Sequence, residues 1–157
     1  MIERKKTKEV RIGNVMVGGD HAVTVQSMTT SKTHDVTATL KEVERLEEAG
    51  CHLIRITVPD QPAADALKEI KKRMNVPLIA DIHFNYRMAL EAVDAGADKI
   101  RINPGNIGGK KKVKEVLDKV KGASLPIRIG VNAGSLEKDL IEKFGYPTPE
   151  ALSLIHI

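Results

Sequence analysis

Short runs of β-branched and other apolar residues alternate along the chain with longer segments in which apolar residues recur every three to four positions. The short runs are typical of buried strands, and the longer spacing is typical of helices that pack through one face. The predicted strands cover residues 23–26, 53–58, 78–81, 99–102 and 127–131. The predicted helices cover residues 37–49, 63–74, 86–95, 111–121 and 136–144, and a further helix begins at Pro149. Single helices between strands predict right-handed βαβ units and a parallel sheet.

A local repeat supports this arrangement. Residues 49–56 and 95–102 both read Ala-Gly, three variable residues and then Ile-Arg-Ile, at an offset of 46 positions. An offset of two βα units is the relation between alternate strands of a (β/α)₈ barrel. Gly50 and Gly96, which follow two of the helices, are predicted to end them in the left-handed conformation.

Residues 10–19 alternate apolar and polar side chains around Gly13-Asn14, which predicts a small β-hairpin. In a barrel, such a hairpin would close the N-terminal end. A doubly wound sheet is the competing architecture, but no Gly-x-Gly-x-x-Gly follows the first strand. The predicted fold is therefore α/β, an incomplete (β/α)₈ TIM barrel of about five βα units preceded by a hairpin.

Composition narrows the classes of protein. The 157 residues are 41% hydrophobic and 29% charged, which excludes a disordered chain and is enough for one domain with a core. No apolar run is long enough to cross a membrane, and the charged N-terminus lacks the apolar region of a secretory signal. The net charge of +4 with only 3% aromatic residues favours a small anionic ligand over nucleic acid. Cys51 is the one cysteine, so we expect a buried structural thiol and a cytoplasmic location.

Arginines stand near the ends of three predicted strands, at Arg55, Arg101 and Arg128. In parallel α/β folds, ligands bind beyond the C-terminal ends of the strands, so these side chains would meet at one rim. Buried arginines are costly without a counter-charge, and their planar forks suit phosphate oxygens. The pattern predicts a phosphate or diphosphate ester as ligand. The alternative is a structural network in which Arg55 and Arg101 pair with Asp81.

Asp81 and His83 lie two residues apart on the same predicted rim. They are candidates for acid–base chemistry or for orienting a substrate hydroxyl, and no third ligand supports a metal. The glycine-rich loop 103–109 could hold phosphate through its backbone N–H groups. In a second polar loop, over residues 130–137, Ser135 is a predicted helix N-cap.

Four motifs resemble the 4-hydroxy-3-methylbut-2-enyl diphosphate synthase family, known as GcpE or IspG. They are VQSMT at 25–29, VPLIADIHF at 76–84, RINPGNIG at 101–108 and IRIGVNAGSLE at 127–137. The resemblance covers nearly all of residues 8–152, in order.

The resemblance implies a TIM barrel that binds 2-C-methyl-D-erythritol 2,4-cyclodiphosphate. It also implies a later domain with a [4Fe-4S] cluster held by three cysteines and a glutamate. Electrons would come from flavodoxin or ferredoxin, in a homodimer. The implied substrate-binding residues are Arg55, His83, Arg101, Asn103, Arg128 and Asn132, and Asp81 is a carboxylate at the same rim.

Compared with the pattern that the resemblance implies, we expect this sequence to supply about five of the eight βα units and not the cluster-bearing domain. We therefore expect residues 1–152 to be the N-terminal part of the barrel domain and residues 153–157 to be a non-native or truncated tail. We expect no bound cluster and no activity from this chain alone. Two alternatives are a pterin-binding barrel similar to dihydropteroate synthase and a non-enzymatic phosphate-binding module; the three arginines and few aromatic residues argue against a pterin.

Overall fold

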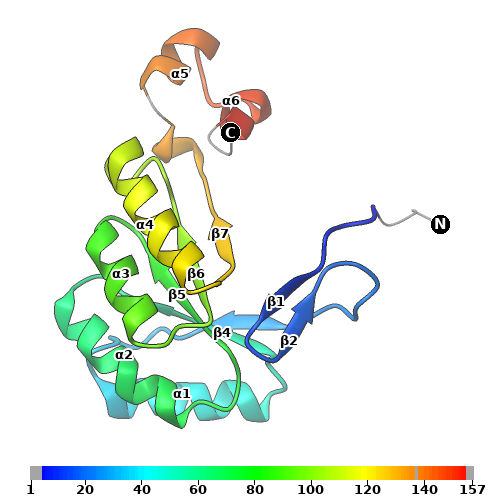
Figure 1. Cartoon of the computed structure of the whole chain (residues 1–157), viewed down its shortest axis with the longest axis vertical. Coiled ribbons are helices and arrows are strands. Elements are labelled where there is room, and N and C mark those ends of the chain that lie inside the picture. The colour runs from blue at the N-terminus through cyan, green and yellow to red at the C-terminus, as the bar shows by residue number, and fades with distance from the viewer. Residues whose placement is uncertain (1–4, 137, 155–157) are drawn as a thin grey trace.

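The computed structural model describes residues 5–136 and 138–154 and has a parallel sheet at its centre (Figure 1). The strands are β3 (Gln26–Met28), β4 (Leu53–Thr57), β5 (Leu78–Ile82), β6 (Lys99–Ile102) and β7 (Ile127–Ile129). They lie in the order β3-β4-β5-β6-β7, so neighbours in sequence are neighbours in space. A doubly wound sheet reverses its strand order at a switch point, and this sheet does not. The order confirms the predicted incomplete barrel.

Helices cover one face of the sheet, and two more extend beyond the end of β7 (Figure 1). The first group is α1 (Val36–Glu48), α2 (Gln61–Arg73), α3 (Tyr86–Asp94) and α4 (Lys110–Gly122), and the second is α5 (Lys138–Phe144) and α6 (Pro149–Leu154). Asp35 and Asp60 cap α1 and α2 by accepting backbone N–H groups. Gly50 and Gly96 follow α1 and α3 at φ 84° and 90°, as predicted. No helix in the described part of the chain is long and apolar enough to span a bilayer.

The sheet has an apolar face toward the helices and a charged face away from them. Side chains alternate along each strand, so residues in register share a face. Ile54, Leu78 and Ile100 belong to the helix-side core and are fully buried. Asp81 is in register with Arg101, and Arg101 with Arg128, on the opposite face. This charged face corresponds to the interior of a barrel.

A hairpin of β1 (Val10–Ile12) and β2 (Val15–Val17) packs against the N-terminal end of that interior face. Ile12 is 1% exposed and forms a small apolar cluster with Leu53 and Ile79, which lie at the beginnings of β4 and β5. The hairpin turns through Gly13 at φ 56°. Its placement agrees with the predicted closure of the N-terminal end.

Two local predictions were wrong. The first strand of the sheet begins at Gln26 and not at residue 23, because Val23 is 76% exposed and the Val25 N–H donates to the His52 ring instead of a strand. Ser135 does not cap a helix: it ends the 3₁₀ turn η1 (Ala133–Ser135), where its hydroxyl donates to the Asn132 carbonyl. Cys51 is buried and unpaired, as predicted.

Of the predicted tail, Ser153 and Leu154 lie in α6, and residues 155–157 lie outside the described residues.

Candidate anion-binding site at the C-terminal rim

The predicted site residues lie at the C-terminal ends of β4 to β7. Arg55, Asp81, Arg101 and Arg128 are within the last three positions of their strands. Two further predicted residues, His83 and Asn103, directly follow β5 and β6, and Asn132 lies in the loop after β7. The right-handed parallel order of the strands brings these positions to one rim.

Asp81 is the centre of the site. It lies on β5, between Arg55 on β4 and Arg101 on β6, and is 1% exposed. Arg101 Nη1 donates to Asp81 Oδ1 at 2.9 Å, and Arg55 Nε lies 3.4 Å from Asp81 Oδ2. His83 Nε2 is 3.9 Å from the same oxygen. The network that the sequence left as an alternative, with Arg55 and Arg101 both paired to Asp81, is therefore present.

Arg55 is incompletely satisfied in this network. Its Nε is buried but has no hydrogen-bond partner, because the approach to Asp81 is long and poorly aligned. Its Nη2 donates to the Met28 sulfur at 3.0 Å, and a thioether is a weak acceptor. A stronger acceptor, such as a phosphate oxygen, would improve the hydrogen bonding of this guanidinium.

Arg128 differs from the other two arginines because it is exposed on β7. Among the residues described, no carboxylate lies within ion-pair distance of Arg128. Asp81 is thus the single described acidic partner of the rim arginines. The rim therefore carries an excess of positive charge.

Lys99 adds a cation that sequence reasoning missed. It stands two positions before Arg101 on β6, and therefore on the same face of the sheet. Burial lowers the pKa of Lys99, and the nearby charge of Arg128 lowers it further. The period of two along β6 was the signal that could have identified this residue.

The two asparagines lie in loops that touch each other. Asn103 is 2% exposed, and its Oδ1 accepts the Gly105 N–H at 3.2 Å, which fixes the start of the β6–α4 loop. The Cα of Gly105 packs so closely on the Ser135 carbonyl that a side chain has no room there. Asn132 is exposed, and its backbone N–H donates to Ser135 Oγ at 3.1 Å. Close packing thus holds both loops beside the arginines.

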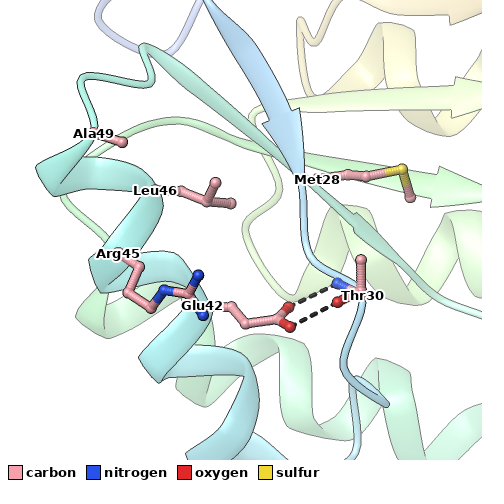
Figure 2. A pocket seen from close by; sticks show the side chains of 6 residues that line it. All are labelled: Met28, Thr30, Glu42, Arg45, Leu46 and Ala49. Carbon is pink, nitrogen blue, oxygen red and sulfur yellow. Dashed lines mark hydrogen bonds between the residues drawn. The ribbon is translucent and has the colours of Figure 1, made fainter.

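A separate pocket of about 320 Å³ lies between β3 and α1 (Figure 2). Its lining residues are Met28, Thr30, Glu42, Arg45, Leu46 and Ala49. In Figure 2, Glu42 and Leu46 point toward β3, whereas Met28 points away from α1. The Glu42 carboxylate accepts hydrogen bonds from Thr30, and Arg45 is the one cationic side chain among the lining residues, whereas the rim brings together three arginines.

The residues present do not fit an iron–sulfur cluster. Within residues 5–136 and 138–154, no three His, Cys, Asp or Glu side chains gather to hold a metal. Cys51 is the only cysteine of the sequence and belongs to the helix-side core next to the N-terminal end of β4.

Solved structures with a similar fold include two dihydropteroate synthases. The enzyme from Yersinia pestis has a TM-score of 0.61 at 16% identity and covers 94% of this chain and 57% of its own. The enzyme from Xanthomonas albilineans with 4-aminobenzoic acid has a TM-score of 0.60 at 17% identity, over 86% and 56% of the two chains. At such low identity, the likeness shows the barrel fold alone.

Sequence relatives are much closer. The chain is 59% identical over 152 residues to 4-hydroxy-3-methylbut-2-en-1-yl diphosphate synthase (flavodoxin) of Anoxybacillus flavithermus, covering 97% of this chain and 42% of the relative. It is 58% identical over 160 residues to the protein of the same name from Geobacillus thermodenitrificans, covering 100% of this chain and 43% of the relative. The chain therefore spans about two fifths of the length of these curated relatives.

The family model described as the GcpE TIM-barrel domain matches residues 7–155, which is most of the sequence and includes every rim residue discussed above. The match agrees with the parallel strand order and with the motifs at the strand ends. On this evidence, the chain belongs to the GcpE TIM-barrel family.

Proposed function

We propose that this chain is the substrate-binding part of a 4-hydroxy-3-methylbut-2-en-1-yl diphosphate synthase. The observation that supports the proposal is the excess of positive charge at the rim, where the three arginines Arg55, Arg101 and Arg128 have one described acidic partner, Asp81. Lys99 adds a further cation on the same face of the sheet, two positions before Arg101. The proposed ligand is 2-C-methyl-D-erythritol 2,4-cyclodiphosphate, a small molecule with two linked phosphates. Its negative charge would offset the repulsion among these cations.

The three rim arginines would have different roles in binding. Arg101 is held in place by its hydrogen bond to Asp81, so its fork is preorganised for phosphate oxygens. Arg55 lies beside the same carboxylate with a donor that a phosphate oxygen could satisfy. Arg128, which has no described ion pair, would close on the diphosphate from β7. In this proposal His83, Asn103 and Asn132 contact the rest of the substrate. Asp81 and His83 remain the candidates for moving a proton.

In the full reaction, the cyclic diphosphate takes up two electrons and two protons, its ring opens at a carbon–oxygen bond to phosphate, and one hydroxyl leaves as water. A [4Fe-4S] cluster would supply the electrons, with flavodoxin or ferredoxin as donor. The described residues do not fit a cluster, so we assign to them no part in electron transfer: they would bind and orient the substrate, with Asp81 and His83 as the candidates for moving a proton. We propose that residues 1–152 belong to the barrel domain, that the electron-transfer step needs the remainder of the longer relatives, and that the complete enzyme is a cytoplasmic homodimer.

Calorimetric titration of the 157-residue chain with the cyclic diphosphate tests the proposal. We expect Arg128→Ala to weaken binding by about 2 kcal/mol, or about 30-fold, because a charged contact to phosphate is lost. Arg73→Ala is the matched control, because Arg73 is an exposed arginine at the end of α2, away from the rim.

Equal affinities of the unchanged chain and Arg128→Ala would refute the proposed role of the rim. The same titration with a pterin tests the alternative that the chain is part of a pterin-binding barrel, and we expect no pterin binding. Binding of the cyclic diphosphate that does not depend on Arg128 would instead favour a phosphate-binding module of another kind.

A further inference from the structure

The guanidinium of Arg101 lies directly against the backbone of Gly130, the residue that follows β7. A Cβ atom built on Gly130 would be 2.5 Å from both Nε and Nη2 of Arg101 and 2.9 Å from Cζ. Real carbon atoms do not approach so closely, so the space that a side chain would take at position 130 is filled by the arginine.

Gly130 cannot easily move away from this contact. Its N–H donates to the Ile102 carbonyl at 2.9 Å, which continues the parallel pairing of β6 and β7 by one step. Gly130 is two positions after Arg128, so a side chain there would point to the same interior face. The backbone at Gly130 has no positive φ, so conformational freedom is not the reason for a glycine here.

Arg101 is also held from its other side. Its Nη1 donates to Asp81 Oδ1 at 2.9 Å, and the Asp81 side chain is only 2% exposed. The guanidinium thus lies between a fixed carboxylate on β5 and a bare Cα beyond β7. Two strand spacings, about 10 Å, separate β5 and β7.

We propose that Gly130 is a positioning residue for anion binding. Because Gly130 has no side chain, the Arg101 guanidinium fits beside its Cα and stays hydrogen-bonded to Asp81, where it faces the diphosphate; we call this space beside Gly130 the seat of Arg101. The proposal rests on the proposed function of the rim. An added methyl group would force the guanidinium out of its seat. Because the arginine tip is flexible, the fold would survive while the geometry of the site changes.

The test uses the 157-residue chain and inorganic pyrophosphate. We expect Gly130→Ala to weaken pyrophosphate binding by about tenfold or more, because small misplacements of a charged contact have large effects. The control is Gly122→Ala, since a Cβ at Gly122 meets nothing within 4 Å. The Nε–Hε signal of Arg101 in the ¹H–¹⁵N spectrum is expected to shift in Gly130→Ala and to stay in place in Gly122→Ala.

A double-variant comparison distinguishes positioning from a general structural effect. If Gly130 acts through Arg101, then Gly130→Ala costs no further affinity when Arg101→Ala has already removed the guanidinium. The double variant also relieves the clash, so it remains testable if Gly130→Ala alone fails to fold. In that case, recovery of folding by Arg101→Ala supports the seat, and continued failure overturns it.

The two proposals fail in different ways. If the unchanged chain does not bind pyrophosphate, the proposed function is in error, and the Arg101 signal alone decides the role of Gly130. If the unchanged chain binds but Gly130→Ala binds equally well, with the Arg101 signal unmoved, the proposed function stands and the positioning role is wrong.

Discussion

At the scale of single residues, one buried carboxylate determines the arrangement of the site. Asp81 is 1% exposed and contacts two arginines from the strands on either side of it. Charges so far from water are costly unless they are paired, and here one negative group serves two positive ones. The remaining positive charge is what makes the rim suitable for a polyanion.

Replacing the carboxylate should therefore destabilise the chain. We expect Asp81→Asn to lower the free energy of unfolding by about 2–4 kcal/mol, since it leaves two partly buried guanidinium groups without a counter-charge. Urea denaturation measures the loss, and saturating pyrophosphate should recover more stability in this variant than in the unchanged chain. Asp118→Asn is the control, because the Asp118–Lys114 pair is exposed to solvent and contributes little to stability. Equal losses in the two variants would contradict a special role for Asp81.

At the scale of elements, Glu42 on α1 ties the loop after β3 to the helix. Its carboxylate accepts the Thr30 N–H and the Thr30 hydroxyl, each at 2.7 Å (Figure 2). It also accepts the Ser31 N–H at 3.1 Å. Burial acts to raise the pKa of Glu42, but these hydrogen bonds outweigh it and lower the pKa from 4.5 to about 2. The ionised form is therefore the one that the fold stabilises.

The lowered pKa predicts how stability changes with acid. Because the pKa of Glu42 falls from 4.5 to about 2 on folding, its contribution is complete above pH 4.5 and is lost as the pH falls toward 2. We expect Glu42→Gln to cost about 1–3 kcal/mol at pH 7, and the difference from the unchanged chain to narrow at pH 3. Urea denaturation at the two pH values measures this, with Glu44→Gln on the exposed side of α1 as the control. A difference that stays constant with pH would show that the charge of Glu42 is not what holds the loop.

At the scale of the whole molecule, the described sheet is open. β3 and β7 each pair with one neighbour, so each has a row of backbone groups that no described strand satisfies. The relatives are more than twice as long as the matched region. A barrel of eight units would join such edges. The proposed binding residues lie in this part, and a ligand set for redox chemistry is not found among the described residues.

We accordingly expect the purified 157-residue chain to acquire no visible iron–sulfur absorbance after anaerobic incubation with iron and sulfide. We also expect no turnover of the cyclic diphosphate with reduced flavodoxin. The full-length relative from Anoxybacillus flavithermus, treated in parallel, is the control. Turnover by the 157-residue chain alone would overturn the proposal that this part binds the substrate while electron transfer needs the remainder of the longer relatives.

Much of the architecture could be predicted from local patterns. The strand at 99–102 was predicted with its observed bounds, and the other four strands overlapped theirs, because β-branched runs and helical spacing are local properties of the chain. Errors fell where contacts outside the pattern decide the structure. Val23 looks like a strand residue but has no neighbour to bury it, and the Ser135 hydroxyl turns back to the Asn132 backbone.

The sequence by itself determined that Arg55, Arg101 and Arg128 would stand on the same rim, because parallel strands end at a common edge and side chains alternate with a period of two. Only the tertiary structure decided which groups they meet. Asp81 reaches both Arg55 and Arg101 because β5 lies between β4 and β6, and Gly130 receives Arg101 because β7 lies next to β6. Such contacts depend on strand order and close packing, which bring together residues that are distant along the chain and carry no local signal of one another.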